Sequence, residues 1–202
     1  MEILVIALGL LSLWIFNARA QARRIVFLSS FLRKYQIEKL METLADGYLR
    51  ALGEKDAERS RQVWAILQTS EEQLCEQVQA LAADLEKVPA PLARFSKLPM
   101  ALPPFLLELL AWSAADLRPL LRLHAEGISQ VAANAEQLSQ RDRAYMLTAE
   151  MLLLQHSCHW FCRSRNMAHA RLLARHQTPY PQVLGAVSAR TREAYGALLG
   201  RR

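Results

Sequence analysis

The stretch WAILQTSEEQLCEQVQALAADLEKV, residues 64–88, carries the apolar pattern that decides the fold. Its apolar residues recur in alternating steps of three and four, which places them on one face of an α-helix and forms a heptad seam, with Glu71 as the polar member. A helix with such a seam needs another helix to cover it, as in a coiled coil. We expect the exposed part of the seam to dock a partner helix. The seam residues assigned to this role are Trp64, Leu67, Leu74, Val78, Leu81 and Leu85.

The composition of the whole chain agrees with a helical fold. The 202 residues include only 7 glycines and 8 prolines, while leucine, alanine, arginine, glutamine and glutamate, all good helix formers, dominate. The length suits one domain, or one domain with an attachment segment. We predict an all-α protein in which a single N-terminal membrane-spanning helix precedes an antiparallel bundle of about five helices.

Residues 1–24, MEILVIALGLLSLWIFNARAQARR, are predicted to form a membrane anchor with a basic flank. Fourteen apolar or small residues run without interruption from Ile3 to Phe16. As a helix they span only about 21 Å of a roughly 30 Å hydrocarbon layer. Trp14 suits the membrane interface, however, and the charge of Arg19 can reach the headgroups. The residues assigned to the anchor are Ile3, Leu4, Trp14, Phe16, Arg19, Arg23 and Arg24.

The charges around the apolar run predict the orientation of this anchor. Glu2 precedes the run and the arginines follow it, which is the reverse of a cleavable secretory signal and holds the C-terminal side in the cytoplasm. We therefore favour a single-pass protein of the inner membrane with a cytoplasmic body. Two alternatives stay open: release of a secreted helical protein by cleavage at Ala20 or Ala22, and a soluble protein that buries this helix.

Prolines divide the rest of the chain into two helical halves. Residues 25–88 are predicted to form an N-terminal helical hairpin, and residues 105–202 the C-terminal half of the same bundle. Between them, residues 89–104 hold five prolines, a density that no helix survives. The stretch from Phe95 to Trp112 is unusually apolar for a connection. We favour packing of this stretch across the end of the bundle over contact with a bilayer.

The C-terminal half is expected to contain three helices. The first begins near Pro104 and kinks or divides at Pro119. The second is long, starting at the capping sequence SQRD, residues 139–142, and ending near His176. The last begins after Thr178, where the sequence TPYP interrupts the chain.

The sequence HSCHWFC, residues 156–162, gathers histidine and cysteine as a metal site would. On a helix, only His159 and Cys162 share a face at ligand spacing. The helix that carries this stretch and the helix before it can form a hairpin that turns near residue 140. In that hairpin His124 lies level with His159 and Cys162 and could be a third ligand for zinc or haem. Because the close paired spacings of zinc sites are missing, we favour a polar helix interface without an ion and expect no cofactor.

Charge is unevenly distributed along the chain. Residues 1–34 hold five basic residues against one acidic, residues 35–140 hold ten against fifteen, and residues 141–202 hold ten against three. We expect arginines of the basic C-terminal part to bind anionic headgroups or the acidic middle of another copy. A partner protein ranks second and nucleic acid last, because no stacking motif or DNA-binding turn accompanies the charges. These arginines are Arg163, Arg171, Arg175, Arg190 and Arg192.

The remaining sequence features argue against catalysis. The chain has no glycine-rich phosphate loop, nucleophile elbow or HExxH sequence. Its three cysteines are an odd number at irregular spacing, which does not predict a disulfide framework. We therefore expect a non-enzymatic, membrane-anchored interaction or scaffold protein on the cytoplasmic face. A metal- or haem-handling membrane protein and a secreted helical protein are the alternatives.

Overall fold

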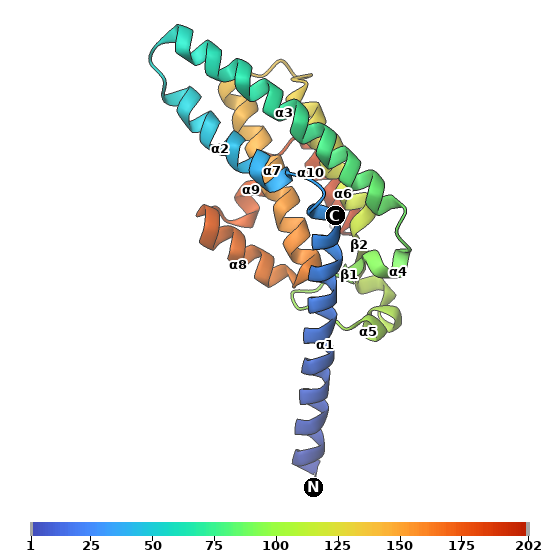
Figure 1. Cartoon of the computed structure of the whole chain (residues 1–202). Coiled ribbons are helices and arrows are strands. Elements are labelled where there is room, and N and C mark those ends of the chain that lie inside the picture. The colour runs from blue at the N-terminus through green and yellow to red at the C-terminus, as the bar shows by residue number, and fades with distance from the viewer. Residues whose placement is uncertain (1, 201–202) are drawn as a thin grey trace.

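A computed structural model describes residues 2–200, so Met1, Arg201 and Arg202 lie outside the described residues. The protein is all-α, with one long N-terminal helix and a helical body (Figure 1). Helix α1, Glu2–Leu32, projects from one end of the body for about half its length, and the N-terminus lies at its free end. The predicted fold class, an N-terminal apolar helix followed by a helical bundle, is confirmed.

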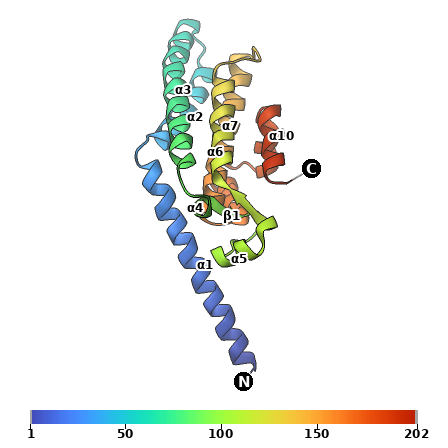
Figure 2. The same ribbon diagram turned by 90° about the vertical axis from the view of Figure 1, so that its right-hand side faces the viewer.

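Helices α2, Ile37–Gly53, and α3, Ala57–Glu86, form a hairpin, whereas residues 25–32, which were predicted to belong to the N-terminal hairpin, are part of α1. Asp56 is the N-cap of α3, since its carboxylate accepts hydrogen bonds from the backbone N–H groups of Glu58 and Arg59. The turn between α2 and α3 forms the end of the body farthest from the N-terminus (Figures 1 and 2). The hairpin therefore extends away from the free end of α1.

The connection between the two halves contains structure that the sequence pattern did not predict. It consists of α4, Ala90–Ala93, strand β1, Arg94–Ser96, α5, Pro104–Leu109, the 3₁₀ helix η1, Ala111–Ser113, and strand β2, Ala114–Asp116. The two strands pair antiparallel, with Phe95 opposite Ala115. Helix α6, Leu117–Ala132, begins only after β2. Pro119 lies in its first turn, where a missing N–H costs no hydrogen bond, so the helix predicted from Pro104 is interrupted before Pro119, between α5 and α6, rather than at it.

Helix α7, Gln140–Cys162, returns antiparallel along α6 in the predicted hairpin. Its N-cap is Ser139, whose hydroxyl accepts from the backbone N–H of Asp142 at 3.1 Å. The predicted register is confirmed by a contact between His124 and Ser157, whose Nε2 and Oγ atoms lie 2.9 Å apart. The hairpin thus brings the middle of α6 against the C-terminal half of α7.

The C-terminal region has more helices than expected. The long predicted helix is divided after Cys162, because the side chain of Ser164 caps a new helix by accepting from the backbone N–H of Met167. This helix, α8, spans Arg165–His176 and turns away from α7 (Figure 1). It is followed by α9, Tyr180–Ala186, and α10, Ala189–Leu198, which packs on α6.

The heptad seam of α3 lies inside the body, between α2 and α6. Four of its side chains, Leu74, Val78, Leu81 and Leu85, are 0% exposed, while Trp64 and Leu67 are 7% and 3% exposed. This corrects the expectation that part of the seam is exposed for a partner. The chain supplies its own covering helices on both sides, so these side chains form the core.

Glu71 is buried in the same seam and is held by two partners. Its carboxylate accepts hydrogen bonds from the Tyr48 hydroxyl at 2.7 Å and from Arg143 Nη1 at 2.6 Å. Arg143 itself is only 14% exposed. A paired carboxylate can therefore occupy a seam position among apolar residues and link α2, α3 and α7.

Candidate functional site

Helix α1 consists of two halves with different surroundings. The predicted anchor residues Ile3, Leu4, Trp14 and Phe16 are all more than half exposed. From Ala20 onward the helix packs on the body, where Ala20, Arg24 and Leu28 are buried. Within residues 2–200, α1 is the helix long and apolar enough to cross a membrane. The part that precedes Ala20 spans about 27 Å at 1.5 Å per residue, close to the thickness of a hydrocarbon layer.

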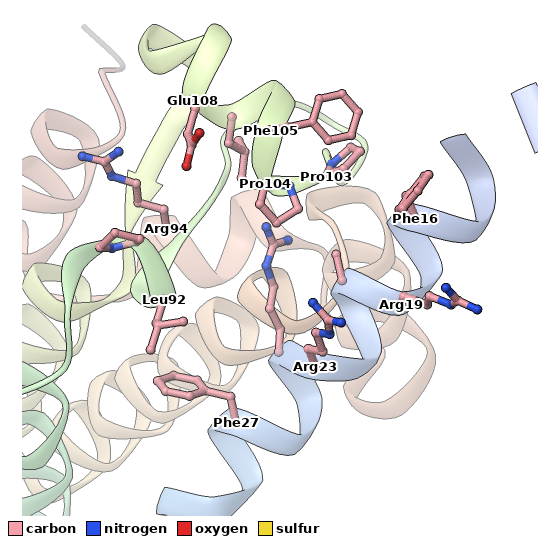
Figure 3. A pocket seen from close by; sticks show the side chains of 14 residues that line it. Phe16, Arg19, Arg23, Phe27, Leu92, Arg94, Pro103, Pro104, Phe105 and Glu108 are labelled. Carbon is pink, nitrogen blue, oxygen red and sulfur yellow. The ribbon is translucent and has the colours of Figure 1, made fainter. Parts of the chain in front are cut away.

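A cavity of about 400 Å³ lies where α1 passes from its exposed half to its packed half. One wall is formed by α1, from Phe16 to Phe27, and the other by α4, β1 and α5 (Figure 3). Most of the lining is apolar. The apolar side chains include Phe16, Phe27, Leu92, Pro103, Pro104, Phe105 and Leu107.

Four arginines and one carboxylate complete the lining of this cavity. Arg19, Arg23 and Arg24 come from α1, Arg94 from β1 and Glu108 from α5. In Figure 3, Arg23 rises from the α1 wall, whereas Arg94 belongs to the opposite wall and its guanidinium extends away from α1; Arg19 also points away from the centre. The ion pairs among residues 2–200 include none of these four arginines. The cavity is therefore amphipathic and carries an excess of positive charge.

The connection around α5 presents a second apolar surface near the same end of the body. Phe95, Ala101 and Leu107 are buried, which agrees with the expected packing across the bundle end. Other side chains of the segment, which we name the α5 face, point outward at 54–77% exposure. Figures 1 and 2 both place α5 at the end of the body from which the free half of α1 projects. The α5 face consists of Met100, Phe105, Leu109 and Trp112.

The candidate metal ligands do not converge. His124 is fully buried, and its Nε2 lies next to the Ser157 hydroxyl rather than His159 or Cys162. Among the residues that the structure describes, no three histidine, cysteine or carboxylate side chains are grouped as metal ligands. Burial lowers the pKa of His159 to about 4 and raises that of Cys162 to about 11. The imidazole is therefore neutral and the thiol protonated at pH 7.

A second polar cluster is enclosed between α6, α7 and α10. Glu150 is fully buried, and its Oε1 accepts from the backbone N–H of Ser188 at 3.1 Å. Burial raises the pKa of this carboxyl group above its ordinary value. Thr191, also buried, lies against Gly127 on α6. Glu150, Ser188 and Thr191 are all buried, so this cluster links α10 to α6 and α7 within the body.

The five arginines predicted to bind anions do not form one site. Arg175 lies 4.0 Å from Glu42 and Arg190 lies 3.5 Å from Glu126, so both face acidic residues of the chain itself. Arg192 donates to the carbonyl of Gly185 in α9 at 3.3 Å. Arg171 is exposed on α8, and only Arg163 approaches α1, where it donates to Gln21 at 3.4 Å.

The cavity could be found only in part from the sequence. Arg19, Arg23 and Arg24 follow an apolar run and were predicted to lie at a membrane surface. Arg94 and the residues of α5 lie about seventy positions later, and no spacing rule relates them to α1. Comparisons with models of protein families, with curated proteins and with solved structures found no match to this chain. The function is therefore inferred from the geometry of the chain.

Proposed function

We propose that this protein is anchored in a membrane by α1 and holds its helical body at the cytoplasmic face, where it organises a partner protein. The division of α1 is the observation that carries this proposal. Its first half is apolar on all sides and exposed, whereas its second half packs on the body. A helix that is apolar all round needs a nonaqueous environment, and a lipid bilayer supplies one.

The charge and continuity of α1 support an uncleaved anchor with a cytoplasmic body. The basic residues Arg19, Arg23 and Arg24 follow the apolar half, in accordance with the positive-inside rule. The helix runs without interruption through Ala20 and Ala22, the two candidate cleavage sites, and Ala20 packs against the body. Cleavage at either position would therefore cut a formed helix at its contact with the bundle.

The α5 face supports a body that rests on the membrane surface. An aromatic and aliphatic surface is stable at a bilayer interface, where Trp and Phe side chains partition favourably. Because this face lies at the end of the body from which α1 projects, the same bilayer would cover both. The α5 face would then hold the body close to the lipid, and the α2–α3 hairpin would extend into the cytoplasm.

The end of the α2–α3 hairpin provides the surface proposed for the partner protein. It exposes three large apolar side chains, Leu49, Leu52 and Ile66, which we name the distal patch. A groove beside the patch is lined by Gly47, Val63 and polar side chains of both helices. Small apolar patches with polar rims are typical of protein interfaces. Anchoring would confine the distal patch near the membrane and raise its effective concentration toward membrane-associated partners.

The anchor is tested by flotation of cell membranes after an alkaline wash. The wild-type chain should float with the membranes, and a fused C-terminal reporter that works only in the cytoplasm should be active. Replacing Leu8 and Leu11 by arginine should release the protein, because each charge at the middle of a span costs about 2.5–3.5 kcal/mol. Leu49→Arg, on the distal patch, is the control that should remain in the membrane. Release of the wild-type chain by the wash would refute the anchor.

The partner surface is tested by a photo-crosslinking side chain placed at Leu52. We expect a defined crosslinked species at this position and none from Glu72, an exposed residue elsewhere on the same hairpin. Adding Ile66→Asp should abolish the species, because it places a charge in the interface. Equal crosslinking from both positions would refute the assignment of the distal patch.

A further inference from the structure

We propose that the cavity between α1 and α5 binds an anionic phospholipid, with its phosphate beside Arg23 and Arg24, the positive charge of Arg94 on the opposite wall, and its acyl chains along the apolar side chains. This inference rests on the proposed anchoring, since the cavity lies where α1 would leave the bilayer. It adds a specific ligand class to what a membrane anchor alone requires. The ligand is a phosphate ester with net negative charge and hydrocarbon chains.

The buried guanidinium of Arg24 is the strongest indication of a missing anion. Arg24 is 8% exposed and lines the cavity. It donates to the Leu102 carbonyl at 3.4 Å, at the long end of the hydrogen-bond range. Among residues 2–200 no carboxylate forms an ion pair with it. Because a buried charge is costly without a counter-charge, a phosphate group in the cavity would stabilise this arrangement.

Arg23 gives the anion a second donor, next to Arg24 on α1. Arg94 belongs to β1 on the opposite wall, where its guanidinium extends away from α1 and adds positive charge to the rim of the cavity (Figure 3). A guanidinium group matches the oxygen geometry of a phosphate and can donate two parallel hydrogen bonds to it. Glu108 is the one acidic residue of the lining, so positive charge remains in excess.

The apolar part of the lining distinguishes a lipid from a free phosphate ion. Phe16 and Phe27 lie on the α1 side, and Leu92 and Phe105 on the opposite side (Figure 3). A phosphate ion has no apolar surface that these side chains could cover, whereas the glycerol and first methylene groups of a lipid do. Phe105 also belongs to the α5 face, so the cavity wall is continuous with the surface proposed to contact the bilayer.

The test measures lipid retention by the full-length chain in detergent, using native mass spectrometry. The chain is incubated with phosphatidylglycerol or with phosphatidylcholine that carries the same acyl chains. The variant Arg23→Gln/Arg94→Gln removes two exposed cavity arginines, and Arg33→Gln/Arg141→Gln removes two exposed arginines outside the cavity. We expect the wild type and the control to retain phosphatidylglycerol over phosphatidylcholine, and the cavity variant to lose about tenfold or more of this retention.

Three results would overturn the proposal. Equal loss in both double variants would mean that diffuse charge, rather than the cavity, attracts the lipid. Equal retention of the two lipids would remove the preference for an anionic headgroup. Displacement of the lipid by inorganic phosphate would assign the cavity to a free anion. Flotation of the same variants separates this proposal from the anchor: chains that float yet bind no lipid refute only the lipid site.

Discussion

Helices α1 and α3 are almost equal in length, with 31 and 30 residues, but their apolar side chains have opposite surroundings. In α3 the seam residues from Trp64 to Leu85 are at most 7% exposed between α2 and α6, and Ile66, which lies off the seam, is 69% exposed. In the first half of α1 the apolar side chains point in every direction and are exposed. Two covering helices can bury one face of a helix but not its whole circumference. The distribution of apolar residues around a helix, more than their number, therefore decides whether the protein itself can bury them.

The largest expected difference in stability is between removing the ion-pair partner of Glu71 in α3 and removing an arginine of α1. Arg143→Ala leaves the Glu71 carboxylate of α3 buried without its ion-pair partner, so we expect a loss of about 3–5 kcal/mol. Arg23→Ala, which removes an exposed and unpaired charge of α1, should change the free energy of unfolding by less than about 0.5 kcal/mol. Urea unfolding of the detergent-solubilised chain, followed by circular dichroism, measures both. Similar losses of unfolding free energy in the two variants would contradict the expected difference between α3 and α1.

Leucine truncation compares the apolar side chains directly. Leu81→Ala in α3 should cost about 2–5 kcal/mol, because the side chain is fully buried and its loss leaves a cavity. Leu10→Ala in α1 removes a side chain that is 63% exposed. It should leave the unfolding of the body unchanged within about 0.5 kcal/mol. The same urea titration measures the free energy of unfolding of both variants. A change below about 0.5 kcal/mol for Leu81→Ala would show that the seam is not buried in solution.

Replacing a glycine by alanine tests how closely neighbouring side chains pack against the helix at that position. At Gly127 in α6, a Cβ atom would lie 2.5 Å from Thr191 Oγ1 and 2.8 Å from Glu150 Oε2. We expect Gly127→Ala to destabilise the body by about 1–3 kcal/mol through overpacking. At Gly9 in α1 nothing lies within 4 Å, so Gly9→Ala should not destabilise it. Thermal unfolding of the two variants would contradict this if both lowered the midpoint equally.

Acid should weaken the body and leave the proposed membrane anchoring unchanged. Burial lowers the pKa of His124 to about 3, whereas in the unfolded chain it is near 6.5. Below pH 6.5 the unfolded state therefore binds the proton first, and stability falls as the pH falls from 6.5 toward 3. At pH 5 the loss from this group is on the order of 1–2 kcal/mol. The half of α1 before Ala20 contains no histidine, so membrane retention should not change between pH 7 and pH 5.

Urea titrations at pH 7 and pH 5 measure this effect, with His124→Gln as the control. The variant removes the titrating group, so its stability should fall less over the same interval. The raised pKa of Glu150 acts in the opposite sense, because the unfolded chain releases that proton more readily as the pH rises. It contributes equally to both proteins and cancels in the comparison. Identical losses in wild type and variant would refute the role of His124.

Local signals in the sequence were sufficient for the helical class and for several helix ends. Ser139 caps a helix where predicted, because a side chain that caps its own backbone needs only its neighbours in sequence. The register of α6 against α7 also followed from one assumed turn position. The division at Ser164 was missed, since a serine after a helical run can equally remain within the helix.

Contacts between distant segments could not be read in this way. The pairing of β1 with β2 joins two three-residue strands, too short to give an alternating pattern. The seam of α3 was predicted to be apolar, but the sequence did not say that α2 and α6 cover it. The arginines of the C-terminal region were grouped by proximity along the chain, whereas folding placed Arg175 and Arg190 beside separate glutamates.

Periodicity and charge order along the chain were enough to establish helices, their apolar faces and an N-terminal segment suited to a bilayer, because each depends on residues within one or two turns of each other. The cavity of four arginines and the α5 face arose only when α1 packed against a connection some seventy residues away. Such proximity depends on how the helices pack around a common core, and the spacing of residues within one segment does not predict it.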